Sequence, residues 1–163
     1  LKFDFTWAAF IYFGFIACLL VITFIDIDHQ IIPNIISLPG IPVFFAASFF
    51  VPEVTASDSI LGIIAGGGSL FLVAWVFNKI TGREGMGQGD MKLMAMIGAL
   101  IGWKGVLVTI FMSSLIGTIV GLLVMVVQKG NMRMAIPFGP FLAIGAICYV
   151  FFGPEMVSWY FSL

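Results

Sequence analysis

Long apolar runs separated by short polar stretches dominate this chain. The first run covers residues 5–25 and ends at Asp26, and a polar stretch at 52–59 follows the second run. A run of about 20 apolar residues has the length of a helix that crosses a bilayer. The pattern therefore predicts about six membrane-spanning helices. Their expected ranges are 5–25, 31–51, 60–80, 91–103, 106–127 and 136–152.

Two of the expected helices depart from a regular span. Pro33, Pro39 and Pro42 fall in the first part of the second run. Because proline lacks a backbone N–H, they predict an irregular start or a kink. The fourth run, 91–103, is too short to cross an average bilayer straight. It is either a short span in a thinned membrane or a segment that extends into its neighbours.

Composition points to lipid as the surroundings of the chain. Hydrophobic residues make up 61% of the 163 residues and charged residues only 9%, whereas soluble domains carry about 25% charged residues. A chain this apolar cannot cover a surface that faces water. We therefore expect an all-α, polytopic integral membrane protein with a single transmembrane domain over residues 1–163. It begins at Leu1 without a methionine, which we interpret as a fragment or a processed form.

The basic residues predict which side of the membrane faces the cytoplasm. With six spans in alternation, the turns after the first, third and fifth spans fall on one side. Five of the seven basic residues lie on that side, whereas Lys2 and Lys104 lie on the other. Because cytoplasmic loops carry an excess of lysine and arginine, we expect the first side to be cytoplasmic. The five residues are Lys79, Arg83, Lys92, Lys129 and Arg133.

Several kinds of site find no support in the residues present. His29 is the only histidine, so a multi-histidine metal site is excluded. Cys18 and Cys148 both lie in apolar runs, where small core residues explain them without a disulfide or a metal. A net charge of −1 without a basic patch gives no sign of nucleic-acid binding. Glycines four residues apart instead predict close helix packing. These pairs are Gly62/Gly66, Gly98/Gly102 and Gly117/Gly121.

Two aspartates on the expected cytoplasmic side are the candidates for chemistry. Asp26 ends an apolar helix, where it either carries function or merely closes the span. Asp90 follows a glycine-rich loop and precedes an apolar run, so it could also be a plain N-cap. Two carboxylates together supply what an aspartyl hydrolase needs. One takes a proton from water, while the other, protonated, donates to the scissile carbonyl oxygen.

Three ordered stretches resemble the type IV prepilin peptidase family. Residues 24–34, FIDIDHQIIPN, resemble its first signature, and residues 84–95, EGMGQGDMKLMA, resemble its second. The second stretch contains the Gly-x-Gly-Asp element that names a class of membrane aspartyl proteases. Residues 136–143, IPFGPFLA, are similar to the family's third shared stretch. By position, the resemblance places the family's two catalytic aspartates on Asp26 and Asp90.

The resemblance implies a membrane-embedded endopeptidase. Members of the family remove the short basic leader from type IV prepilins and pseudopilins at the cytoplasmic face of the bacterial inner membrane. They cut after a glycine and before a hydrophobic residue, and proteolysis by two aspartates needs no metal or cofactor. Many members also methylate the new amino terminus with S-adenosylmethionine.

The chain departs from the full family pattern at its N-terminal side. Longer members carry a cytoplasmic segment with Cys-x-x-Cys motifs, thought to bind zinc, and they have eight spans. This chain contains neither that segment nor two of those spans. Zinc and methyl transfer are therefore expected only in a longer parent protein.

Further residues beside the aspartates have two interpretations each. Gly85, Gly87 and Gly89 could let an extended substrate backbone approach the aspartates, or could serve only as a hinge. Asp28 and Glu84 could attract the basic leader, or could simply be solvated at the membrane surface.

Two other classes of function stay open. A transporter or channel subunit would use membrane carboxylates to bind cations or relay protons. Against it, no carboxylate lies near the middle of an expected span and no inverted repeat is evident. A non-catalytic scaffold is disfavoured because both aspartates and the loop glycines are present. The sequence does not indicate which prepilin is cleaved, which pathway it serves, or the oligomeric state.

Overall fold

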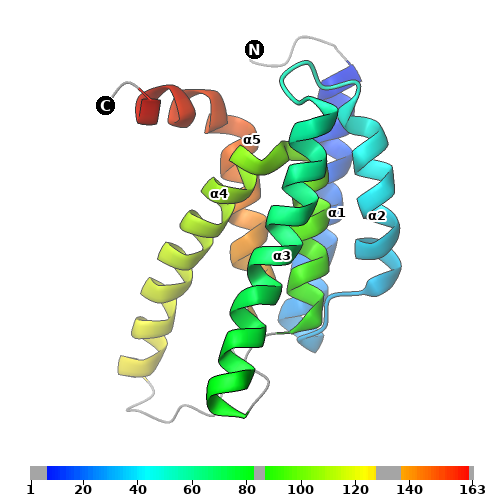
Figure 1. Ribbon diagram of the computed structural model, residues 1–163. Helices are drawn as coiled ribbons and strands as arrows, with labels where there is room; N and C mark the ends of the chain where they lie inside the picture. Colours follow the sequence, from blue (N-terminus) through cyan, green and yellow to red (C-terminus); the bar gives the residue numbers. More distant parts are fainter. Residues whose placement is uncertain (1–6, 83–86, 128–136, 162–163) are drawn as a thin grey trace.

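The computed structural model describes residues 7–82, 87–127 and 137–161, with side chains up to residue 153. This part of the chain is helical without a strand, which confirms the expected all-α class. Three of its helices, α1, α3 and α4, are long and apolar enough to cross a membrane, and two others are shorter. The five helices (Figure 1) are α1 Trp7–His29, α2 Asn34–Ser48, α3 Ala56–Thr81, α4 Gln88–Val127 and α5 Gly139–Phe161.

Helix α4 differs most from the expected pattern. The expected spans 91–103 and 106–127 form one long helix that is interrupted at Gly102, where φ is 68° and ψ is 179°. Glycine tolerates a positive φ of this size, whereas other residues are strained there. The chain turns back at this point, so that the two halves of α4 run in opposite directions (Figure 1). The described residues therefore form five labelled helices, and α4 joins the two expected spans 91–103 and 106–127 across the break at Gly102.

The break in α4 rests against the beginning of α3. Thr55 and Asp58 cap α3 reciprocally: the Asp58 N–H donates to Thr55 Oγ1 and the Thr55 N–H to Asp58 Oδ2, each at 3.2 Å. The other carboxylate oxygen, Asp58 Oδ1, accepts a hydrogen bond from Trp103 Nε1 at 3.1 Å. A Cβ on Gly102 would lie 3.1 Å from Asp58 Cβ. The cap of α3 thus holds the turn between the two halves of α4.

Glycine allows the half of α4 before the break to lie directly on α3. A Cβ on Gly62 would overlap the carbonyl oxygen of Gly98, and a Cβ on Gly66 would lie 2.5 Å from the carbonyl oxygen of Met94. Neither contact leaves room for a side chain. The predicted close packing is confirmed for these glycines, whereas Gly121 has open space around it.

The same half of α4 forms the centre of the bundle. Leu93, Met96 and Leu100 are completely buried there. On the outer faces of other helices, by contrast, large apolar side chains are exposed, such as Ile35 at 83% and Ile80 at 78%. Exposed apolar surface of this extent is foreign to soluble monomers and typical of helices that face lipid.

Candidate active site

Asp26 belongs to the buried face of α1. The sequence predicted Asp26 at the end of this helix; the helix continues to His29, so Asp26 lies within its last turn. The buried residues of α1 follow one another at intervals of three or four, which places them on one face of the helix. Asp26 is the last of them and is 5% exposed. The full set is Phe15, Leu19, Ile22 and Asp26.

One oxygen of Asp26 is held by the beginning of α5. The backbone N–H of Gly139, the first residue of α5, donates to Asp26 Oδ2 at 3.0 Å. The first N–H groups of a helix have no partner inside the helix, so a carboxylate satisfies them well. A Cβ on Gly139 would lie 2.5 Å from the same oxygen, so this contact requires glycine. This bond holds Oδ2 in place, whereas Oδ1 accepts no hydrogen bond within the described residues.

Asp90 lies inside the first turn of α4, where a loop had been expected to continue to residue 89. The helix begins at Gln88, so Asp90 is not its N-cap. Asp90 is 9% exposed, and its carboxylate has no hydrogen-bond partner within the described part of the chain. It lies close enough to Asp26 for two negative charges to repel each other. Both candidates therefore lie at the end of the bundle where α1 ends and α4 begins (Figure 1).

Ile32 links the three stretches that the sequence singled out. Its side chain is 7% exposed. A Cβ on Gly89 would lie 2.7 Å from Ile32 Cβ, and a Cβ on Gly139 would lie 3.4 Å from Ile32 Cδ1. Residues from all three stretches thus meet beside the two aspartates. Sequence reasoning missed Ile32 and the Gly139 N–H as parts of the site, and their membership of those stretches was the only signal available.

The other candidate residues differ in how close they lie to the aspartates and in how exposed they are. Gly87 is exposed just before α4, and a Cβ on it would lie 3.5 Å from Asp90 Oδ2. Gly89 lies in the first helical turn with Ile32 against it. Asp28 is exposed in the last turn of α1. The remaining two, Glu84 and Gly85, lie outside the described residues.

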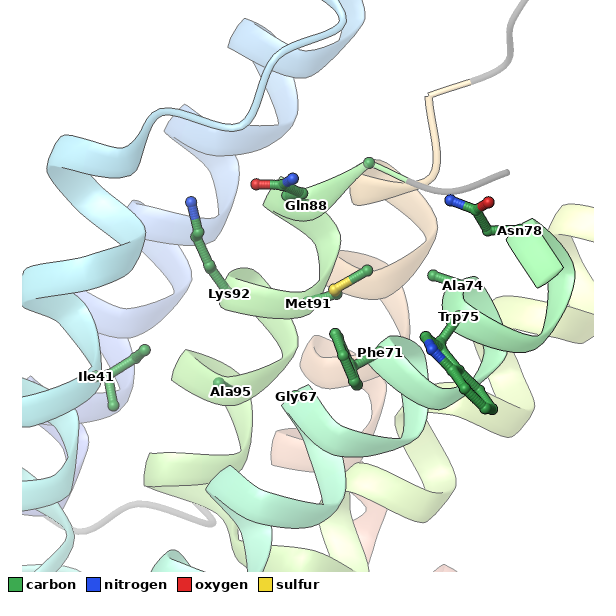
Figure 2. Close-up of a pocket in the computed structure, with 11 residues that line it drawn as sticks. Ile41, Gly67, Phe71, Ala74, Trp75, Asn78, Gln88, Met91, Lys92 and Ala95 are labelled. Atoms are coloured by element: carbon green, nitrogen blue, oxygen red, sulfur yellow. The ribbon is translucent and has the colours of Figure 1, made fainter. Parts of the chain in front are cut away.

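A groove runs along the other face of the same half of α4, between α2, α3 and α4 (Figure 2). Its volume is about 630 Å³, and Phe71 and Met91 are among its apolar walls. Gln88, Met91 and Ala95 point into it from α4. At about 100° per residue, this helical spacing places Asp90 on the opposite side. Neither aspartate lines the groove, but Gly87 does, so one end of the groove reaches the edge of the site.

Two carboxylates buried together have a restricted chemistry. Repulsion makes it costly for both to ionise, so such a pair shares one proton. The ionised member can accept a proton from water, and the protonated member can donate to a carbonyl oxygen. Asp26 and Asp90 lie on different helices, so their separation depends on how α1, α4 and α5 pack.

Comparison with known proteins identifies the same family from a family profile and from individual relatives. The profile of the type IV leader peptidase family matches residues 13–122. Three curated proteins named prepilin leader peptidase/N-methyltransferase are similar to the chain. The protein from Pseudomonas putida is 40% identical to the chain over 140 residues, and the protein from Pseudomonas aeruginosa is 37% identical over 158 residues. The protein from Xanthomonas campestris is 35% identical over 159 residues. These matches cover 86%, 97% and 98% of the chain, but 49%, 54% and 55% of the relatives. The chain thus spans about half the length of the curated relatives it matches. No solved structure matches it.

Proposed function

Because the chain belongs to the type IV leader peptidase family, we propose that it is the membrane-embedded part of an aspartyl endopeptidase that removes the basic leader from type IV prepilins or pseudopilins. The observation that supports the proposal is that Asp26 and Asp90, from two separate sequence stretches, are both buried at the same end of the bundle, where the charge of Asp26 acts on Asp90. No finding among the described residues favours a transporter.

In the proposed reaction a water molecule attacks the peptide carbonyl between the two aspartates. One carboxylate takes a proton from this water, and the other donates its proton to the carbonyl oxygen, without a covalent intermediate. The Gly139 N–H keeps Asp26 Oδ2 as an acceptor. Asp26 then exchanges its proton through Oδ1, which fixes the direction from which the water approaches.

The structure narrows the role of the glycines before Asp90. Gly89 lacks a side chain because Ile32 fills that space, which is a packing requirement. Gly87, by contrast, is exposed and lies beside the Asp90 carboxylate. We propose that the substrate backbone passes Gly87 on its way to the aspartates. Asp28, exposed at the same end, together with Glu84 would attract the basic leader.

We also propose a topology for this catalytic part. The two halves of α4 count as separate spans, which gives six with α1, α2, α3 and α5. The end that carries the aspartates faces the cytoplasm of a bacterial inner membrane. In support, Lys79 lies in the last turn of α3 and Lys92 in the second turn of α4 at this end, whereas Lys104 follows the break at the other end.

Methyl transfer and zinc binding are proposed only for a longer parent protein. The curated relatives are named as N-methyltransferases as well as peptidases, and they are about twice as long as this chain. With two cysteines, the chain cannot by itself form the four-cysteine zinc site that paired Cys-x-x-Cys motifs provide. Proteolysis needs neither group.

The proposed function is tested by cleavage of a model prepilin in liposomes. We expect a single cut after the glycine that ends the leader, detected by mass spectrometry of both products. A prepilin with alanine in place of that glycine serves as the control and should be cleaved poorly. Absence of cleavage in a chain that remains folded would contradict the proposal for this part of the protein.

Replacement of Gly139 should disturb the site without unfolding the protein. In Gly139→Ala the new Cβ meets Asp26 Oδ2, so the carboxylate has to move. A displacement of about 1 Å at a catalytic group costs up to roughly 100-fold in rate, and we expect a loss of kcat of that order. Gly121→Ala, with open space around the new Cβ, is the matched control and should retain full activity. Equal activity of both variants would show that the Gly139 contact does not position Asp26.

A further inference from the structure

Apart from Gly87 at its edge, the groove between α2, α3 and α4 has no role in the proposed proteolysis. Its inner part is apolar, with Phe71 on α3, Met91 on α4 and Ile41 on α2 (Figure 2). Gly67 and Ala95 add no bulk to the walls, which leaves a volume of about 630 Å³. An opening of this kind in a helix bundle exposed to lipid has the size of common small-molecule sites.

The rim of the groove is polar and cationic at one end only. Asn78 and Gln88 lie at the end of α3 and the beginning of α4. Lys92, half-buried, uses one of its three donors on Asn34 Oδ1 at 2.9 Å. Lys79 Nζ lies 4.7 Å from the centre of the Trp75 ring, which itself lines the groove. The rim thus offers Lys92 and two amide side chains above an apolar slot, and Lys79 lies next to the groove through its contact with Trp75.

The positive charge at the rim favours an anionic phospholipid over the basic leader of the substrate as the occupant of the groove. The substrate of the proposed function has a basic leader, which two lysines at the rim would repel. A phospholipid with an anionic headgroup fits instead, because basic pockets between helices bind such headgroups. Among the described residues, none that lines the groove is a carboxylate. A tryptophan beside the rim also suits the level of the headgroups.

We propose that this groove binds an anionic phospholipid, with an acyl chain along Phe71, Met91 and Ala95 and the phosphate at Lys92 and Lys79. Lys92 lies in the first turns of α4, and its bond to Asn34 joins α4 to α2. A lipid held there would brace the same helical segment that carries Asp90. The lipid site goes beyond the proposed function, and binding can be measured without any proteolysis.

Binding is tested by native mass spectrometry of the detergent-purified chain titrated with phosphatidylglycerol or phosphatidylcholine. We expect phosphatidylglycerol to bind more tightly. Lys92→Gln and Lys79→Gln should each weaken that binding roughly fivefold, because a lysine near an anionic headgroup contributes about that factor. Ala74→Trp fills the groove and should abolish binding of either lipid.

Lys104 offers a matched control at the other end of the bundle. Its Nζ lies 5.8 Å from the centre of the Trp103 ring, so it repeats the lysine–tryptophan pair without the groove. Lys104→Gln should leave phosphatidylglycerol binding unchanged. Equal affinity for both lipids, or equal weakening by Lys104→Gln, would overturn the proposal. So would unchanged lipid binding in Ala74→Trp with weakened prepilin binding, a result that would assign the groove to the substrate.

Discussion

We expect Asp26→Asn and Asp90→Asn each to lower kcat/KM for prepilin cleavage by roughly 10²- to 10⁴-fold, the range that positioned acids and bases contribute. Asparagine keeps the shape of aspartate but can neither accept the proton of water nor donate one to the carbonyl oxygen. In the Asp26 variant the amide oxygen can still accept the Gly139 N–H. Both proteins should therefore remain folded, which circular dichroism and thermal unfolding in detergent would verify.

Asp28→Asn is the matched control for this pair. Asp28 lies two residues after Asp26 in the same helical turn but is exposed, whereas Asp26 is buried. Its replacement should leave kcat unchanged and alter at most the KM for a substrate with a basic leader. A large loss of kcat in this variant, with normal turnover in Asp26→Asn, would move the catalytic role to Asp28.

The variant that lacks both aspartates gives a second check. Residues that act as a unit in one step show strongly non-additive losses. We therefore expect Asp26→Asn/Asp90→Asn to be about as inactive as the worse single variant. Losses that multiply would mean that the two carboxylates act in separate steps, and activity that survives either single change would reject the pair.

The helices could be predicted from apolar runs, but their ends and connections could not. Runs of about 20 apolar residues identify each helix, because lipid demands them. The expected break between the fourth and fifth spans does exist, at Gly102. Its geometry depends on Asp58 and Trp103, which meet from distant parts of the chain. No local pattern encodes such a contact, so the sequence could not predict that the chain turns back at Gly102.

For the site, too, some parts could be predicted from the sequence and others could not. Asp26 and Asp90 were found from residue type, depth and the resemblance, whereas the buried face of α1 that carries Asp26 was seen only in the structure. The role of Gly139 could not be predicted, because Gly139 acts through its backbone N–H at the beginning of another helix. Backbone donors carry no residue signature, and only the packed structure reveals their partners.

The packing of α3 on α4 should be the most sensitive point of the fold. Gly62→Ala places a Cβ against the carbonyl group of Gly98, and neither backbone can yield without moving its helix. Overpacking of this kind costs about 1–3 kcal/mol, and we expect the free energy of unfolding to fall by about 2 kcal/mol. Reversible unfolding in mixed detergent micelles would measure the change.

Gly68→Ala provides the comparison within the same helix. Gly68 has nothing within 4 Å of the added Cβ, so the substitution changes helix propensity alone. Alanine is favoured over glycine inside a helix by up to about 1 kcal/mol, so this variant should be at least as stable as the parent chain. Only Gly62→Ala should also slow cleavage, because the displaced helix carries Asp90 at its first turn. Equal stability of the two variants would show that α3 and α4 can move apart without cost, and the position of Asp90 would then have to depend on the packing of α4 against α2 and α5.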